Sequence, residues 1–131
     1  MIEVYTDAAS RGNPGDSGIG IIIKSGKEYE RYSYFIGEWA NHEAEFHAVI
    51  KALEICAEKF PDDVLSFRTD SKVVVDTIEK NHTKNEKFLP LLERIRQLSS
   101  CFPLFFIKWI PDRENKQADR LAKEAIWNKN D

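Results

Sequence analysis

Four acidic residues occupy comparable places in the chain, each near an end of an expected secondary-structure element. Asp7 and Asp70 end apolar, strand-like runs, and Glu45 and Asp119 lie early in segments of helical periodicity. Singly, such residues are usually structural, because Asp is common in turns and Glu near a helix N-terminus offsets the macrodipole. If the two strands are parallel neighbours, Asp7 and Asp70 meet at the carboxyl edge of the sheet, where open α/β sheets bind ligands. The four carboxylates therefore favour one shared site.

Converging carboxylates repel one another, so a site of this kind needs a cation. The three histidines, His42, His47 and His82, show no zinc-ligand spacing with the cysteines Cys56 and Cys101. Ligation by oxygen alone favours Mg²⁺ or Mn²⁺ over zinc. Two such ions in one acidic site can activate water and stabilise the leaving oxygen when a phosphodiester is cleaved. The predicted chemistry is therefore metal-assisted hydrolysis.

The elements that must position these side chains follow from the spacing of apolar residues. Strands are predicted at 2–6, 18–24, 28–36, 64–69 and 104–110, and helices at 42–60, 71–79, 88–98 and from 115 or 116 to 128. Asn41 is the expected N-cap of the long helix. A meander of three strands followed by β-α-β units predicts an α/β fold with a mixed sheet flanked by helices. A length of 131 residues suits a single domain, 1–131.

Composition restricts the environment and the partners. Hydrophobic residues make up 42% of the chain and charged residues 31%, which argues against disorder. The net charge is −3, so a nucleic-acid partner would require Lys and Arg to gather on one face. No signal peptide or membrane-spanning run is visible, and both cysteines are expected as reduced thiols in or near the core. We expect a cytoplasmic monomer with no membrane partner and no obligate protein partner.

Four segments, in this order, carry a resemblance to a known family: YTDAASRGNPG, NHEAE, TDS and ENKQADRLAKEA. The set resembles ribonuclease H of type one, in a short, bacterial-like form without the basic protrusion of longer members. The resemblance implies a five-stranded mixed sheet of order 3-2-1-4-5 and endonucleolytic hydrolysis of the RNA strand of RNA–DNA hybrids. It also implies two ions of Mg²⁺ or Mn²⁺ held by the catalytic acids Asp7, Glu45, Asp70 and Asp119. Asp7 would bridge both ions, Glu45 and Asp70 would hold the first, and Asp119 would help hold the second.

The resemblance further implies a nucleic-acid contact surface. Asn13 and Asn41 would contact the RNA 2′-hydroxyls, the group that separates RNA from DNA. The full set of implied contacts is Ser10, Arg11, Gly12, Asn13, Asn41, His42, Ser71 and Lys72. Arg113 is a possible auxiliary residue in place of the loop histidine of many members. Ala8-Ala9 departs from the Gly-Ser that often follows the first Asp, and His42 and Lys72 replace an Asn and a Gln.

Two alternatives remain open. The missing basic protrusion, the missing loop histidine and the negative net charge motivate a hybrid-binding protein with weak or no catalysis. The second alternative is a nuclease of the same superfamily that acts on DNA.

Among the remaining residues, Lys116, Arg120 and Lys123 are expected on a solvated helix face, and Trp39 and Trp109 in packing. The GIGIII stretch lacks the spacing of a dinucleotide-binding loop.

Overall fold

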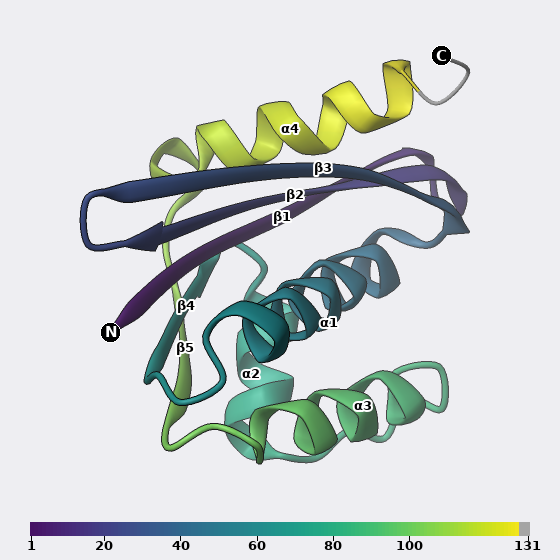
Figure 1. Ribbon diagram of the computed structural model, residues 1–131. Coiled ribbons are helices and arrows are strands. Elements are labelled where there is room, and N and C mark those ends of the chain that lie inside the picture. The colour runs from purple at the N-terminus through teal and green to yellow at the C-terminus, as the bar shows by residue number, and fades with distance from the viewer. Residues whose placement is uncertain (129–131) are drawn as a thin grey trace.

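A single five-stranded sheet organises the computed structural model, which describes residues 1–128 (Figure 1). Its strands run in the order β3-β2-β1-β4-β5, which confirms the predicted mixed sheet. The first three strands pair antiparallel, and β1 pairs parallel with β4, as β4 does with β5. The strands are β1 (Ile2–Gly12), β2 (Gly15–Ser25), β3 (Glu28–Trp39), β4 (Leu65–Thr69) and β5 (Phe105–Trp109).

Helices cover both faces of this sheet. In Figure 1, α4 lies alone on one side, while α1, α2 and α3 lie on the other. Their bounds are α1 (Asn41–Lys59), α2 (Lys72–Lys80), α3 (Leu89–Ser99) and α4 (Lys116–Trp127), with a short 3₁₀ turn, η1 (Asp112–Glu114), before α4. None of the described helices combines the length and hydropathy that crossing a membrane requires.

The main core lies between the sheet and α1. One apolar stripe of α1 faces the alternating apolar side chains of the strands there. Phe46 and Leu53 of α1 and Val4 and Phe67 of the sheet are fully buried. Burial at about 25 cal/mol per Å² of apolar surface makes this layer the main source of stability.

Several expectations need correction. The first three strands extend well beyond the predicted 2–6, 18–24 and 28–36, because β1–β3 form long hairpins whose ends carry polar residues. The prediction that Asn41 caps α1 is wrong, since Ala40 occupies the N-cap position and Asn41 is already helical. Cys56 is buried as expected, but Cys101 is exposed because it follows the end of α3 in a turn.

The GIGIII stretch has a packing role that spacing alone did not indicate. A Cβ atom added at Gly20 would lie 2.0 Å from the carbonyl oxygen of Ala118, and one at Gly18 would lie 2.3 Å from that of Ala122. Since real Cβ atoms do not come so close to backbone, both glycines are needed for α4 to sit directly on β2. The small, buried Ala118 and Ala122 complete this close contact on the helix side.

Replacing Gly20 with Ala is expected to lower the free energy of unfolding by about 2–3 kcal/mol, because the added methyl group meets backbone that cannot move aside. Urea denaturation measures the change. Gly26→Asn is the control, since Gly26 has a φ of +61°, which Asn tolerates, and open space around it. A loss for Gly20→Ala no larger than that of the control would contradict the close-approach argument.

Candidate active site

Asp7 and Asp70 meet because β1 and β4 are parallel neighbours. Their register pairs Thr6 with Thr69, so the next residue on each strand carries a carboxylate at the same edge. Beyond this point β4 ends, whereas β1 continues along β2 to Gly12, and the two chains separate. Glu45, on the second turn of α1, reaches into the gap. One carboxylate oxygen from each of Asp7, Glu45 and Asp70 lies within 4.8 Å of the other two.

Burial and mutual repulsion make this cluster electrostatically costly. Asp7 is only 4% exposed. Burial, followed by the charge of Asp70, raises the pKa of Asp7 to about 8, although the Ala8 N–H donates a hydrogen bond to Asp7 Oδ1 at 2.9 Å. Burial and the charges of Asp7 and Asp70 raise the pKa of Glu45 well above its usual value. Burial is also the main cause of the raised pKa of Asp70. A cation here would relieve all three.

The donor set fits a hard divalent cation. All three groups offer oxygen, the donor that Mg²⁺ and Mn²⁺ prefer. In the described part of the chain, the buried Oε1 of Glu45 has no hydrogen-bond partner, which leaves a lone pair for a ligand. The charges of Asp70 and Asp119 both contribute to the raised pKa of Asp7.

Asp119 lies in the same cavity but outside the tight cluster. The cavity has a volume of about 340 Å³ and is lined by Asp7, Ala8, Glu45, Asp70, Asp112, Lys116, Asp119 and Lys123. Lys123 forms an ion pair with Asp119, with 3.0 Å between Nζ and Oδ2. A cation bound by Asp119 would therefore compete with this ammonium group.

Three charged residues of the cavity were not identified as site residues from the sequence. Asp112 precedes α4 in η1, and its charge contributes to the raised pKa of Asp70. Lys116 and Lys123 are exposed, as expected for a solvated face, yet they also line the cavity. Helical spacing shows that the two lysines share a face, but only the placement of α4 decides what that face borders.

Asn115 fixes the start of α4 relative to the strand that carries Asp7. It is 2% exposed, and its Nδ2 donates to the carbonyl oxygen of Thr6 at 2.9 Å. Because this side chain bonds to β1, it does not cap the helix that follows. The contact holds the first turns of α4, and hence Asp119, beside Thr6 in the middle of β1 and next to Asp7.

Five of the predicted nucleic-acid contacts lie in or beside the β1–β2 hairpin. Asn13 and Asn41 are both exposed and adjacent, since the Asn41 N–H donates to Asn13 Oδ1 at 2.9 Å. Ser10 Oγ lies 2.7 Å from Ser17 Oγ in the hairpin that also presents Arg11 and Gly12, and Gly12 has a φ of +101°. Their roles in binding stay predictions.

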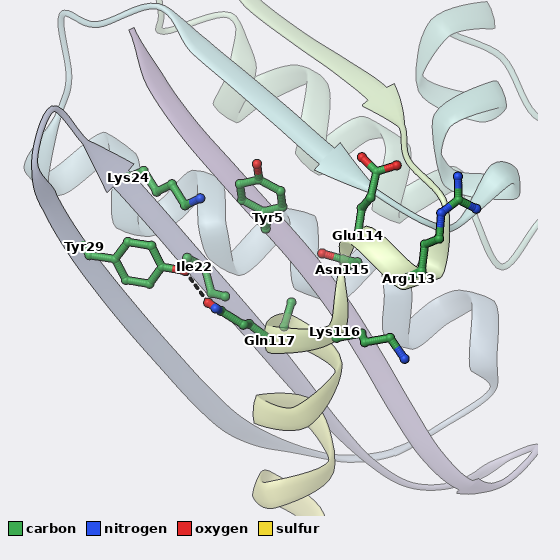
Figure 2. A pocket seen from close by; sticks show the side chains of 10 residues that line it. Tyr5, Ile22, Lys24, Tyr29, Arg113, Glu114, Asn115, Lys116 and Gln117 are labelled. Carbon is green, nitrogen blue, oxygen red and sulfur yellow. Dashed lines mark hydrogen bonds between the residues drawn. The ribbon is translucent and has the colours of Figure 1, made fainter.

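The remaining predicted residues occupy different environments. His42 and Lys72 are exposed, and Lys72 Nζ lies 5.8 Å from the ring centroid of Trp109. Ser71 is 8% exposed, and its Oγ accepts a hydrogen bond from the Val74 N–H as the N-cap of α2. Arg113 lines a neighbouring cavity (Figure 2), so its auxiliary role stays a prediction.

The two tryptophans and the Ala8-Ala9 pair can now be placed. Trp39 packs on His47 with 4.2 Å between ring centroids, as expected. Trp109 is 46% exposed and so lies at the rim, where its indole N–H donates to the carbonyl oxygen of Asp70 at 3.1 Å. Ala8 packs against the core while its N–H holds Asp7. Nothing in the structure explains the preference for Ala at position 9.

The chain is similar to known proteins along nearly its whole length. Residues 5–125 match a family model described as reverse transcriptase-like. The chain is 43% identical to "Putative hydrolase EbsB" of Enterococcus faecalis, over 96% of this chain and 94% of that protein. It is 39% identical to a ribonuclease H of Erythrobacter litoralis, over 95% and 94% of the two chains.

Two solved structures are similar along nearly their whole length. Ribonuclease H1 of Halobacterium salinarum matches with a TM-score of 0.89 and 33% identity, covering 97% of this chain and 98% of that one. LC11-RNase H1, solved in complex with an RNA/DNA hybrid, matches with a TM-score of 0.91 and 30% identity, covering 98% and 99%.

The cluster predicts how stability depends on pH when no cation is bound. The folded state keeps a proton on Asp7 up to a pKa of about 8, whereas an exposed Asp releases it near 3.8. Between these values the folded state binds more protons, so the free energy of unfolding should decrease as pH rises. Each unit of pKa shift corresponds to about 1.4 kcal/mol. Urea unfolding in the presence of a chelator, across this pH range, measures the slope.

The Asp7→Asn variant is the control for this pH experiment. It cannot lose a proton at that position, so its stability should fall less steeply with pH than that of the unmodified chain. Saturating Mg²⁺ should stabilise the unmodified chain more at high pH than at low pH, since a cation binds the ionised carboxylates. Equal slopes for the two chains would contradict the assignment of the raised pKa to Asp7.

Proposed function

Since the chain belongs to the ribonuclease H family, in its type-one branch, we propose that it hydrolyses the RNA strand of RNA–DNA hybrids with two bound divalent ions. The observation that carries the proposal is the approach of Asp7, Glu45 and Asp70 to within 4.8 Å at the carboxyl edge of the sheet. The hybrid complex of LC11-RNase H1, a structure with the same fold, supports the choice of substrate.

The four acids would divide the binding of two Mg²⁺ or Mn²⁺ ions. Asp7 would contact both, because it is the most buried of these acids and lines the same cavity as Asp70 and Asp119. Glu45 and Asp70 would hold the first ion, and Asp119 would help hold the second after leaving Lys123. When bound, the ions supply an activated water and stabilise the leaving 3′-oxygen, so no protein nucleophile is needed.

The chain's own groups would orient the substrate around this centre. Asn13 and Asn41 stand next to each other on an exposed surface, where their polar atoms can meet RNA 2′-hydroxyls. Lys116 and Lys123 border the acidic cavity and can approach backbone phosphates from α4. Lys72, exposed at the start of α2, can do the same beside Asp70. Together these groups surround the reacting phosphate with cations and hydrogen-bond partners.

Asp70→Asn should abolish cleavage of a labelled hybrid in Mg²⁺ while leaving the fold intact. The substitution removes a metal-binding charge but little volume, and a loss of at least about 100-fold is expected, comparable to that for one key electrostatic contact in other active sites. Asp76→Asn, an identical change at an exposed position of α2, is the matched control and should cleave normally. Cleavage by Asp70→Asn at the rate of this control would refute the site assignment.

A comparison of substrates separates this proposal from its alternatives. Labelled hybrid, duplex RNA and duplex DNA are incubated with Mg²⁺ and, separately, with Mn²⁺, and both binding and cleavage are followed. We expect cleavage of the RNA strand of the hybrid alone. Binding of the hybrid without cleavage in either metal would instead favour the hybrid-binding protein, and cleavage of duplex DNA would favour a nuclease of different substrate class.

A further inference from the structure

A row of cations and tyrosines crosses the sheet face on the α4 side, outside the acidic cavity. The guanidinium carbon of Arg31 lies 4.4 Å from the ring centroid of Tyr29. Lys24 Nζ lies 5.3 Å from the Tyr29 centroid and 4.9 Å from that of Tyr5. At the other end of the row, the guanidinium carbon of Arg68 lies 5.4 Å from the ring centroid of Tyr5.

Strand register continues this row to the sheet edge. Tyr5 is the pairing partner of Arg68, which is in turn the partner of Lys108 on β5. We call the set the cation–aromatic stripe: Arg31, Tyr29, Lys24, Tyr5, Arg68 and Lys108. It touches all five strands, so it spans about 19 Å at the usual strand spacing of about 4.8 Å.

Most cations of the stripe have no acidic partner. Among residues 1–128, no carboxylate lies within ion-pair distance of Lys24, Arg31 or Lys108, whereas Arg68 is paired with Glu3 at 3.0 Å. Cation–π contacts hold the ammonium and guanidinium groups in place but do not neutralise them. A chain of net charge −3 therefore carries a positive strip on this face.

A cavity lies at the centre of the stripe, at the start of α4 (Figure 2). It has a volume of about 280 Å³. Tyr5, Lys24 and Tyr29 form one side, and Tyr29 donates a hydrogen bond to Gln117 Oε1 on the other. The first N–H groups of α4 have no side-chain cap, and Asn115 Oδ1, in the same lining, is buried without a partner among the described residues. Donors and an acceptor are thus available to a ligand.

We propose that the stripe binds the phosphate backbone of a single nucleic-acid strand. Within the described residues, the three unpaired cations Lys24, Arg31 and Lys108 fit a polyanion and outnumber Glu114, the one acidic residue in the cavity lining. A cavity of about 280 Å³ can admit a group of nucleotide size but not a duplex, so a single strand is the form that would enter it beside Lys24. Because Lys24, Arg31 and Arg68 already lie over the tyrosine rings, the rings position cations, and recognition is independent of base sequence.

Lys116 connects this surface to the acidic cavity, since it lines both. A strand leaving the active site could therefore pass over Lys116 onto the stripe. This choice of a nucleic-acid strand over other polyanions rests on the proposed function. The occupant that follows is a single-stranded extension of a hybrid substrate.

The test compares binding of a blunt hybrid with that of the same hybrid carrying a single-stranded extension. Fluorescence anisotropy is measured with a chelator present, so that no cleavage occurs, over a series of salt concentrations. The unmodified chain should bind the extended hybrid at least about fivefold more tightly at low salt, because further phosphates are neutralised. The Lys24→Gln, Arg31→Gln double variant should lose this gain, and its salt slope for the extended hybrid should fall by about 1.4, or about 0.7 for each contact.

Two further variants keep the test decisive. Lys27→Gln, in the exposed turn after Lys24, is the matched control and should retain the gain. Lys108 is exposed on the edge strand, and Lys108→Gln should lose part of the gain in affinity for the extended hybrid. This variant tests the stripe if the double variant fails to fold. Equal binding of blunt and extended hybrids by the unmodified chain, or a gain that survives in both stripe variants, would overturn the proposal.

Failure of the proposed function would look different from failure of the stripe. If the unmodified chain binds extended hybrid more tightly and the stripe variants lose that gain, the stripe is supported even where Mg²⁺ yields no cleavage. Cleavage of blunt hybrid with no preference for the extension would support the enzyme and refute the stripe. A single-stranded RNA of the extension's sequence should compete for the gain, and one of a different sequence should compete equally.

Discussion

Repulsion among Asp7, Glu45 and Asp70 is the constraint around which the structure is arranged. Bringing carboxylates to within 4.8 Å of one another in a mostly buried setting costs free energy. The pKa values of all three carboxyl groups are raised for this reason. The cost is tolerated because the surrounding elements fix the backbone positions of the three residues. Asp7 and Asp70 are fixed by strand register, and Glu45 by the packing of α1 on the same sheet. A rigid scaffold thus maintains a site that favours cation binding.

The opposite face of the sheet contributes to the same site by different means. Gly18 and Gly20 let the backbone of α4 approach β2 closely, and Asn115 ties the start of that helix to β1. Together these contacts set both the height and the position of α4 above the sheet, and thereby bring Asp119 into the acidic cavity. A residue with no obvious chemistry, such as Gly20, can therefore matter as much to the site as a carboxylate does. Packing and catalysis are linked here through one helix.

The sequence allowed the main features to be predicted where local pattern and long-range geometry agree. Asp7 and Asp70 follow strand-like runs, and parallel strands bring their ends to one edge. Prediction failed where a tertiary contact decides. The terminal residues of β1–β3 look like loop but pair in long hairpins, and the polar Asn41 looks like an N-cap but follows the true cap, Ala40. The proximity of Lys116 to both cavities depends on where α4 is placed, which no local pattern contains.

Charge distribution resolves the apparent conflict between an acidic chain and a polyanionic substrate. Without ions, the carboxylates of the cavity would repel a phosphate backbone, and the net charge of −3 would do the same at longer range. Each divalent ion bound there cancels two of those charges, so metal binding and substrate binding must favour each other. Lys116 and Lys123, which line the cavity, act over the short distances that salt leaves unscreened. Affinity for nucleic acid therefore depends on where the cations stand, and the total charge of the chain is a poor guide to it.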